Sequence, residues 1–127
     1  MELTEFVLSQ LPAAPVRVLE VGCGEGELAR ALADAGYHLA AIDPEAPDGP
    51  IFRRTTIEAF AEPGPFDAVV ASRSLHHVED LGGVLDKLVR LLRGPLVLYD
   101  AELPEEVNLQ YGHDNTPTPR RVGAGAG

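Results

Sequence analysis

Short apolar runs alternate with amphipathic stretches along the first hundred residues of this chain. The apolar runs predict buried strands at residues 16–21, 37–43, 51–54, 66–71 and 95–99. The amphipathic stretches predict helices at residues 4–11, 25–35 and 80–93, with a single helical turn at 57–61. Glycines and prolines separate these segments, as Gly36 and Gly94 do where two of the helices are expected to end.

The regular alternation of strands and helices indicates the α/β class. Strands that are each followed by a helix pair in parallel through right-handed crossovers. The expected strands are continuously apolar rather than alternating, which is typical of a sheet covered by helices on both faces. The fold class therefore follows from the pattern before any motif is considered.

This pattern stops near residue 100. From Ala101 onward the chain has several acidic residues and prolines, few large apolar residues, and a Gly-Ala-Gly-Ala-Gly ending. Such a composition is typical of a flexible tail. We therefore expect one domain at residues 1–100 and a flexible tail at 101–127.

A glycine-rich turn, Gly22-Cys23-Gly24-Glu25-Gly26, lies between the first expected strand and the next helix. Glycines at such a turn permit unusual backbone angles and let a ligand approach the main chain closely. Dinucleotide folds place their third glycine one residue later, beside a pyrophosphate. Here Glu27 occupies that position, and Glu25 adds a second negative charge. The turn thus favours a nucleoside ligand without phosphate over NAD or FAD.

Two acidic residues accompany the turn. Asp43 ends the second strand, where a carboxylate can hold ribose hydroxyls; alternatively it only forms the turn ahead of Pro44. Glu20 interrupts a buried strand, and a buried carboxylate is costly unless something pairs with it. A cationic group on the ligand would supply that pair, and an ion pair with Arg17 or another basic residue is the alternative.

These segments together resemble the class I S-adenosylmethionine-dependent methyltransferases. Residues 19–26 look like motif I of that family, and 41–43 like its ribose-binding strand end. Residues 56–58 occupy the place where the family contacts adenine. Residues 66–72, followed by 75–77, are similar to its fourth strand and the segment after it, especially in small-molecule members of the quinone-biosynthesis type.

The resemblance implies a Rossmann-like three-layer sandwich with strand order 3-2-1-4-5, and methyl transfer from S-adenosylmethionine to a small molecule. It implies a general base for which His76 is the candidate. The implied cofactor-binding residues are Glu20, Gly22, Cys23, Gly24, Gly26, Asp43, Pro44, Thr56, Ile57, Ser72 and Leu75. For Cys23 a reactive thiol near a helix start is one interpretation, and a small residue that fits the turn is the one we favour.

Two departures from the family pattern leave other functions open. Thr56-Ile57 stands where the family commonly has an acidic-small pair. The family sheet also continues past the fifth strand with a helix and an antiparallel hairpin, so we expect a truncated sheet that lacks this hairpin. The alternatives are a degenerate module that binds S-adenosylmethionine without turnover, and a protein that self-associates through an exposed fifth strand. A nicotinamide dehydrogenase is disfavoured by the glycine spacing.

Charge and composition exclude some partners and settings. The net charge of −10 would repel a phosphate backbone, so no nucleic-acid partner is expected. The apolar runs are too short for a membrane span. A single cysteine allows no internal disulfide, which favours the cytoplasm. No histidine or cysteine has neighbours at metal-ligand spacing, and Arg53 and Arg54 are expected to be solvated.

Overall fold

The structure, a computed structural model, describes residues 3–72 and 79–99. Within them, five strands form one sheet in the order β3-β2-β1-β4-β5, and every neighbouring pair is parallel. The strands are β1 (Arg17–Val21), β2 (His38–Asp43), β3 (Phe52–Arg54), β4 (Ala68–Ser72) and β5 (Leu96–Tyr99). Because all five run the same way, their carboxyl ends meet at one edge of the sheet, called the carboxyl edge below.

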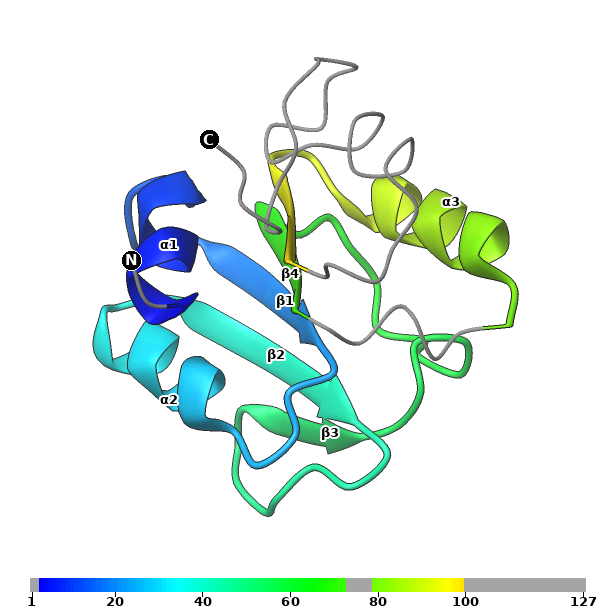
Figure 1. Cartoon of the computed structure of the whole chain (residues 1–127), viewed down its shortest axis with the longest axis horizontal. Coiled ribbons are helices and arrows are strands. Elements are labelled where there is room, and N and C mark those ends of the chain that lie inside the picture. Colours follow the sequence, from blue (N-terminus) through cyan, green and yellow to red (C-terminus); the bar gives the residue numbers. More distant parts are fainter. Residues whose placement is uncertain (1–2, 73–78, 100–127) are drawn as a thin grey trace.

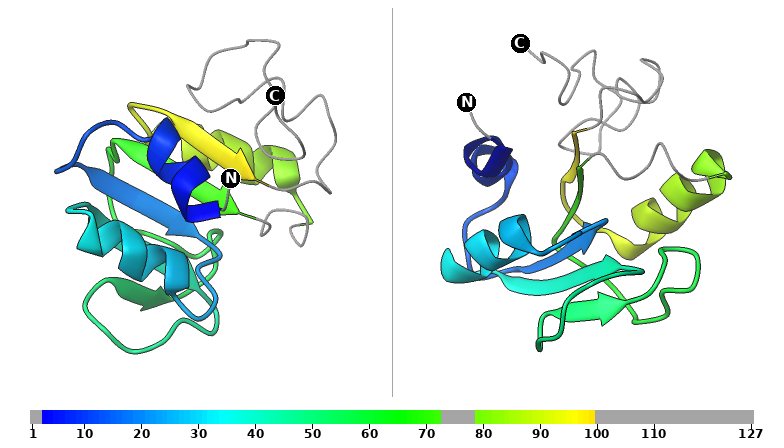
Figure 2. Two further views of the ribbon diagram at one scale, coloured as in Figure 1. Left: turned by 60° about the vertical axis from the view of Figure 1, so that its left-hand side comes forward. Right: turned by 60° about the horizontal axis from the view of Figure 1, so that its bottom comes forward.

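Three helices cover the two faces of this sheet. They are α1 (Leu3–Gln10), α2 (Glu27–Asp34) and α3 (Leu81–Leu91). Helices α1 and α2 pack on one face and α3 on the other, which makes three layers (Figures 1 and 2). The α/β class, the Rossmann-like architecture and the strand order expected from the sequence are therefore confirmed.

The core lies between the sheet and its helices on both faces. Four of the five residues of β1 are buried, and so are the four middle residues of β2. The largest fully buried apolar side chains come from both central and outer elements: Phe66, Leu19, Leu32, Ile42, Leu85, Leu88 and Leu96. Strands buried on both faces explain why the sequence shows continuous apolar runs there.

Helix boundaries follow local capping. Helix α2 begins at Glu27, two residues later than expected, because Gly26 adopts a left-handed conformation with φ 93° and interrupts the helical geometry. Helix α3 begins after Asp80, whose carboxylate Oδ1 accepts a hydrogen bond from Gly83 N at 3.0 Å. Residues 57–59 form a hydrogen-bonded turn in place of the expected helical turn, with Phe60 N donating to Ile57 O at 3.3 Å.

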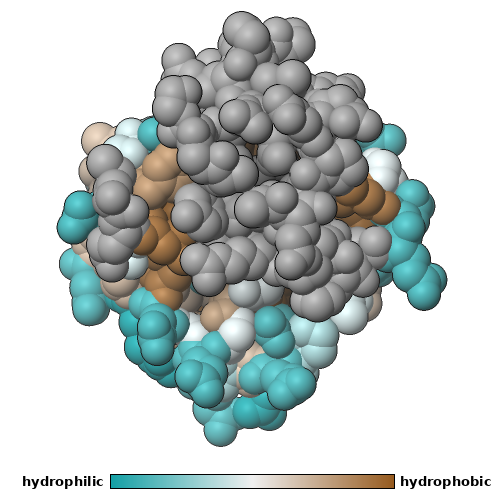
Figure 3. Space-filling view, in the orientation of Figure 1, coloured by the Kyte–Doolittle hydropathy of each residue, from teal (hydrophilic) through white to brown (hydrophobic). Residues whose placement is uncertain are grey.

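The surface over β3 and the β2–β3 connection is hydrophilic. Figure 3 shows this polar region along the lower part of the view, where Figure 1 places β3 and the loop before it. Prolines and charged residues dominate this stretch of the sequence. None of the helices in the described ranges combines the length and apolarity needed to cross a bilayer.

Candidate functional site

The glycine loop, residues 22–26, leaves β1 at the carboxyl edge and is anchored to the neighbouring strand β2. Gly22 N and Cys23 N both donate to the carbonyl oxygen of Ile42, at 2.8 and 3.0 Å. Gly26 N donates back to Cys23 O at 2.9 Å, which closes the turn. The loop is thus held by main-chain bonds, and its conformation does not depend on side chains of its own.

Three glycines give the loop its shape. Gly22, Gly24 and Gly26 have φ values of 81°, 54° and 93°, all in the region that residues with side chains rarely adopt. Gly26 has a second constraint, since a Cβ there would lie 2.5 Å from the Phe52 ring. A Cβ at Gly24 would meet nothing within 4 Å, so a ligand can approach the backbone there.

Asp43 joins the glycine loop to the loop that follows β2. Its Oδ2 accepts from Gly24 N at 3.0 Å and its Oδ1 accepts from Glu45 N at 2.8 Å. Its main-chain oxygen accepts from Ala46 N at 3.0 Å and from Thr55 N at 3.2 Å. Asp43 therefore does form the turn before Pro44. Each carboxylate oxygen has a further lone pair for a ligand, so the two interpretations of this residue are compatible.

Glu20 lies near the carboxyl end of the central strand β1 and is only 1% exposed. Its neighbours across the two adjoining strands are Ala41 and Val70, which are both apolar. Its Oε1 has no hydrogen-bond partner among the described residues. Burial, and after it the nearby charge of Asp43, raises the pKa of the Glu20 carboxyl to about 7.

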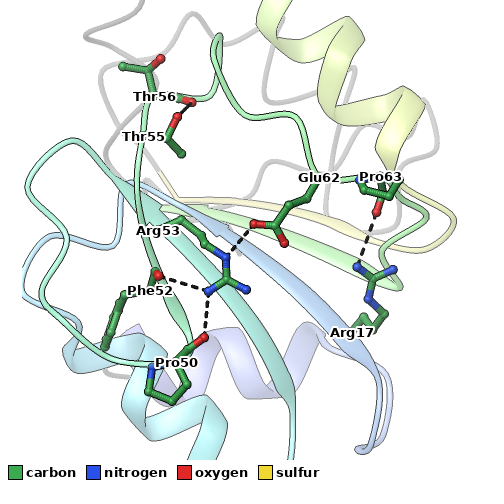
Figure 4. Close-up of polar contacts among 8 residues, drawn as sticks. All are labelled: Arg17, Pro50, Phe52, Arg53, Thr55, Thr56, Glu62 and Pro63. Carbon is green, nitrogen blue, oxygen red and sulfur yellow. Dashed lines mark hydrogen bonds and ion pairs between the residues drawn. The ribbon is translucent and has the colours of Figure 1, made fainter.

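Arg17, the basic partner considered for Glu20, is engaged at the opposite edge of the sheet. Its guanidinium donates to Pro65 O at 3.0 Å and stacks 4.4 Å from the centre of the Phe66 ring. It also reaches Pro63 O at 3.5 Å, as Figure 4 shows. The ion pair between Arg17 and Glu20 is therefore absent.

An open depression of about 230 Å³ lies over Glu20 and the glycine loop. Its walls come from the loop and from the first residues of α1 and α2: Leu3, Glu20, Gly22, Cys23, Glu25, Gly26, Glu27 and Leu28. It thus brings together four of the predicted binding residues. Gly26 offers no side-chain cap to α2, so the first N–H groups of that helix are left for solvent or a ligand.

Cys23 is 8% exposed and belongs to a small apolar cluster with Ala29, Ala41 and Ala46. Burial, and after it the charges of Glu20 and Asp43, raises the pKa of its thiol to about 12. A thiol that stays protonated is a poor nucleophile. The favoured interpretation of Cys23 as a small residue that fits the turn agrees with this environment.

The remaining predicted residues belong to segments other than the glycine loop. Thr56 is exposed, and its Oγ1 accepts from Ala59 N at 3.1 Å; Figure 4 draws it beside Thr55 after β3. Ile57 is 5% exposed and packs in the core. Ser72 ends β4 at the carboxyl edge. Leu75 and His76 lie outside the described residues.

The sequence analysis missed the role of two arginines on β3. Arg53 forms an ion pair with Glu62, with Nε and Oε2 2.6 Å apart, and donates to Pro50 O at 2.8 Å (Figure 4). Arg54 donates through Nε to Ala46 O at 2.7 Å and pairs with Asp48. Both side chains are partly exposed to solvent, as expected, and they also hold the loops on either side of β3.

Comparison with known proteins identifies the family. The methyltransferase domain family matches this chain over residues 2–113. The chain is also 35% identical over 104 residues to a ubiquinone biosynthesis O-methyltransferase from Xylella fastidiosa; this alignment covers 70% of the chain and 42% of the relative. The chain therefore belongs to the methyltransferase domain family, and it spans less than half the length of the curated relatives it matches.

Solved structures of methyltransferases share its fold. A proposed methyltransferase of an antibiotic biosynthesis pathway from Anabaena variabilis superposes with a TM-score of 0.69 at 23% identity, covering 76% of this chain and 44% of the other. Magnesium protoporphyrin IX methyltransferase from Synechocystis, solved with bound S-adenosylmethionine, superposes with a TM-score of 0.63 at 20% identity. It covers 81% of this chain and 56% of the other.

Proposed function

We propose that this chain binds S-adenosylmethionine at the depression over the glycine loop and transfers its methyl group to a small molecule. The observation that carries the proposal is Glu20, a fully buried carboxylate beneath the depression whose Oε1 lacks a partner in the part of the chain that the structure describes. A buried carboxylate without a cation is unfavourable, so the presence of Glu20 at this position supports a ligand that brings positive charge. The amino group of S-adenosylmethionine is such a charge.

Bound S-adenosylmethionine would supply an electrophilic methyl group on a sulfonium. The chain's own residues would hold and orient it. Gly22, Gly24 and Gly26 keep the loop free of side chains, so the methionine portion can lie against the main chain. Glu20 would accept from the amino group, and Asp43 would accept from the ribose hydroxyls with the lone pairs that Gly24 N and Glu45 N leave free.

The other predicted residues complete the proposal. Pro44, Thr56, Ile57, Ser72 and Leu75 would border the nucleoside, and His76 would act as a general base towards the acceptor. Glu25 and Glu27, both exposed at the depression, add negative charge where a dinucleotide would place its pyrophosphate. This charge favours a nucleoside without phosphate. Methyl transfer itself depends mainly on orientation, which can lower a barrier by roughly 7–11 kcal/mol.

Calorimetric titration with S-adenosylmethionine and with S-adenosylhomocysteine tests the binding part. We expect micromolar affinity, equivalent to about 8 kcal/mol. Asp43→Ala should lose most of it, whereas Asp48→Ala, which removes an exposed carboxylate from the same loop, should keep it. Absence of binding by a folded chain, or equal affinity of the two variants, would contradict the proposal.

The acceptor is proposed as an oxygen on a small molecule, because the relative from Xylella fastidiosa is an O-methyltransferase of ubiquinone biosynthesis. A panel of catechols and other phenols, assayed for the appearance of S-adenosylhomocysteine, tests this part. The second candidate is a module that binds the cofactor without turnover. Binding without turnover on any acceptor would support it.

The setting and partners are also part of the proposal. We place the cofactor domain at residues 1–100 and in the cytoplasm, because the chain's single cysteine, Cys23, is free and allows no internal disulfide. The net charge of −10 argues against a nucleic-acid partner. Strand β5 has β4 as its only strand neighbour in the described sheet, so a second copy could pair with its other edge. Sedimentation of the purified chain over a range of concentrations tests this self-association.

A further inference from the structure

Resting on the proposed function, we propose that Glu20 is protonated in the free chain and releases its proton when a ligand presents an ammonium group to it. Binding of the ligand is then coupled to release of the Glu20 proton. The step involves no covalent change in the ligand. The O–H bond of the Glu20 carboxyl breaks, the proton goes to the buffer, and the carboxylate accepts hydrogen bonds from the ligand's ammonium.

The geometry of Glu20 supports a protonated resting state. The side chain is 1% exposed, lies between apolar residues of β2 and β4, and has an Oε1 without a partner among the described residues. A charge held there without a counter-ion would cost several kcal/mol, and protonation removes most of that cost. A neutral carboxyl is therefore the stable form of this group below about pH 7 when no ligand is bound.

The charged and titratable groups around Glu20 act in the same direction. Asp43, at the end of β2, is the charge that acts on it most strongly. Cys23 and Glu25 from the glycine loop and Glu27 from α2 share the depression with it, and none of them brings positive charge. Helix α1 contributes Leu3 there, and the strand residue beside Glu20 on β4 is Val70.

The two arginines nearest in the sequence are bound elsewhere. Arg17 lies at the other edge of the sheet, as described above. Arg30 donates to Glu25 O at 2.9 Å and sits 5.3 Å from the centre of the Phe52 ring. Within the described residues, the first cation that Glu20 can meet is therefore one that arrives with a ligand.

This coupling predicts how affinity depends on pH. Burial and Asp43 raise the pKa of Glu20 to about 7 in the free chain, and a bound ammonium lowers it again. Below pH 7 the ligand must displace a proton, so affinity should fall by up to tenfold for each pH unit. Above pH 7 the carboxylate is already ionised, and affinity should depend little on this group. The expected curve rises with pH and levels off near 7.

Calorimetric titration at pH 6 in phosphate and in imidazole, two buffers with different heats of ionisation, measures the released proton. For S-adenosylhomocysteine, which carries the ammonium, we expect release of about 0.9 proton per ligand, the protonated fraction at pH 6 for a pKa near 7. For 5′-methylthioadenosine, which has no ammonium, we expect the same heat in both buffers. Glu20→Gln should remove the buffer dependence, and Asp86→Asn, which neutralises an exposed carboxylate on α3, should retain it.

The outcomes separate this inference from the function on which it rests. Binding with equal heats in the two buffers overturns proton release and leaves cofactor binding intact. Failure of every ligand to bind a folded chain overturns the proposed function and this inference together. A ligand-free test covers the case in which the Glu20 variant no longer binds. Carbon NMR of the free wild-type chain should show the Glu20 carboxyl titrating near pH 7, and titration near 4.5 would overturn the inference.

Discussion

The carboxyl groups at the two edges of the sheet have pKa values shifted in opposite directions. The amino ends of the strands meet at the other edge, called the amino edge below. There Asp67, the residue before β4, accepts from Arg17 N at 2.8 Å and from Arg93 Nε at 2.6 Å. The Arg93 guanidinium first, and then the Arg17 amide, hold the pKa of Asp67 below its ordinary value. At the carboxyl edge, Glu20 has a raised pKa and no basic partner among the described residues.

This difference separates a carboxylate with a structural partner from one for which we propose a role in binding. At the amino edge, the Asp67 carboxylate is paired with Arg17 and Arg93 of the same chain. At the carboxyl edge the main chain of the glycine loop is hydrogen-bonded, but Oε1 of Glu20 has no partner among the described residues, which is unfavourable for stability alone. A site of this kind gains its missing interaction only from something that binds. The four predictions below test the contrast, from the largest expected effect to the smallest.

Gly94→Ala should be the most damaging change, because it disrupts the amino edge where backbone packs on backbone. A Cβ at Gly94 would lie 1.9 Å from the main-chain oxygen of Asp67, so β4 or β5 would have to move. We expect a loss of about 3 kcal/mol in the free energy of unfolding, measured by urea denaturation. Gly82→Ala in α3, where a Cβ meets nothing within 4 Å, should instead stabilise by about 0.5 kcal/mol. Similar effects at both positions would contradict the packing argument.

Glu20→Gln should change the pH dependence of stability. A carboxyl whose folded pKa is raised from 4.5 to about 7 stabilises the fold below pH 4.5, and this contribution is lost as the pH rises through 7. The loss amounts to about 3 kcal/mol for the wild-type chain. The variant should lack this decline between pH 4.5 and 8. If the two stability curves run in parallel over that range, Glu20 is not the group responsible.

Asp67→Asn should have the opposite pH signature and a smaller size. Because its folded pKa lies below the ordinary 3.8, Asp67 stabilises the chain at neutral pH and loses this contribution as the pH falls through the folded value. We expect the variant to be about 1 kcal/mol less stable at pH 7, since hydrogen bonds to a charged acceptor are weakened. Thermal unfolding should show this gap closing in acid. A gap that persists at pH 2 would indicate a purely steric cause.

Arg30→Gln should have the smallest effect. Its guanidinium stacks on Phe52 and bonds to Glu25 O, so it braces the glycine loop from outside, at an exposed position. Exposed cation–π contacts contribute about 0.5–1 kcal/mol, and a loss of that size is expected in urea denaturation. A loss above about 2 kcal/mol would mean that the main-chain bonds of the loop are not sufficient to hold it.

The sequence predicted those features that depend on local pattern. Strand positions follow from apolar runs, and the glycine loop follows because only glycine tolerates the backbone angles found at residues 22, 24 and 26. The separation of Arg17 from Glu20 could also have been predicted from the sequence, since residues an odd number apart on a strand point to opposite faces. The pairing of Glu20 with Arg17 could have been set aside on that basis.

Features that depend on distant segments could not be predicted. The close approach of Gly94 to Asp67 arises only when β5 packs beside β4. The partners of Arg53 and Arg54 are carbonyls and carboxylates on irregular loops, for which no period exists in the sequence. The fit of Gly26 against Phe52 likewise joins the glycine loop to β3, which is brought there by the pairing of β2 with β3.

The central position of β1 has a consequence for how the chain is made. Its two neighbours, β2 and β4, lie on opposite sides of it, and the contact between Arg17 and Asp67 spans 50 residues. Closing a segment of that length loses entropy before any new contact compensates, which slows folding. During synthesis, β1 is therefore complete but open along one side until β4 has left the ribosome. The sheet that carries the glycine loop is finished only when β4 has been made, although the loop itself is translated before β2.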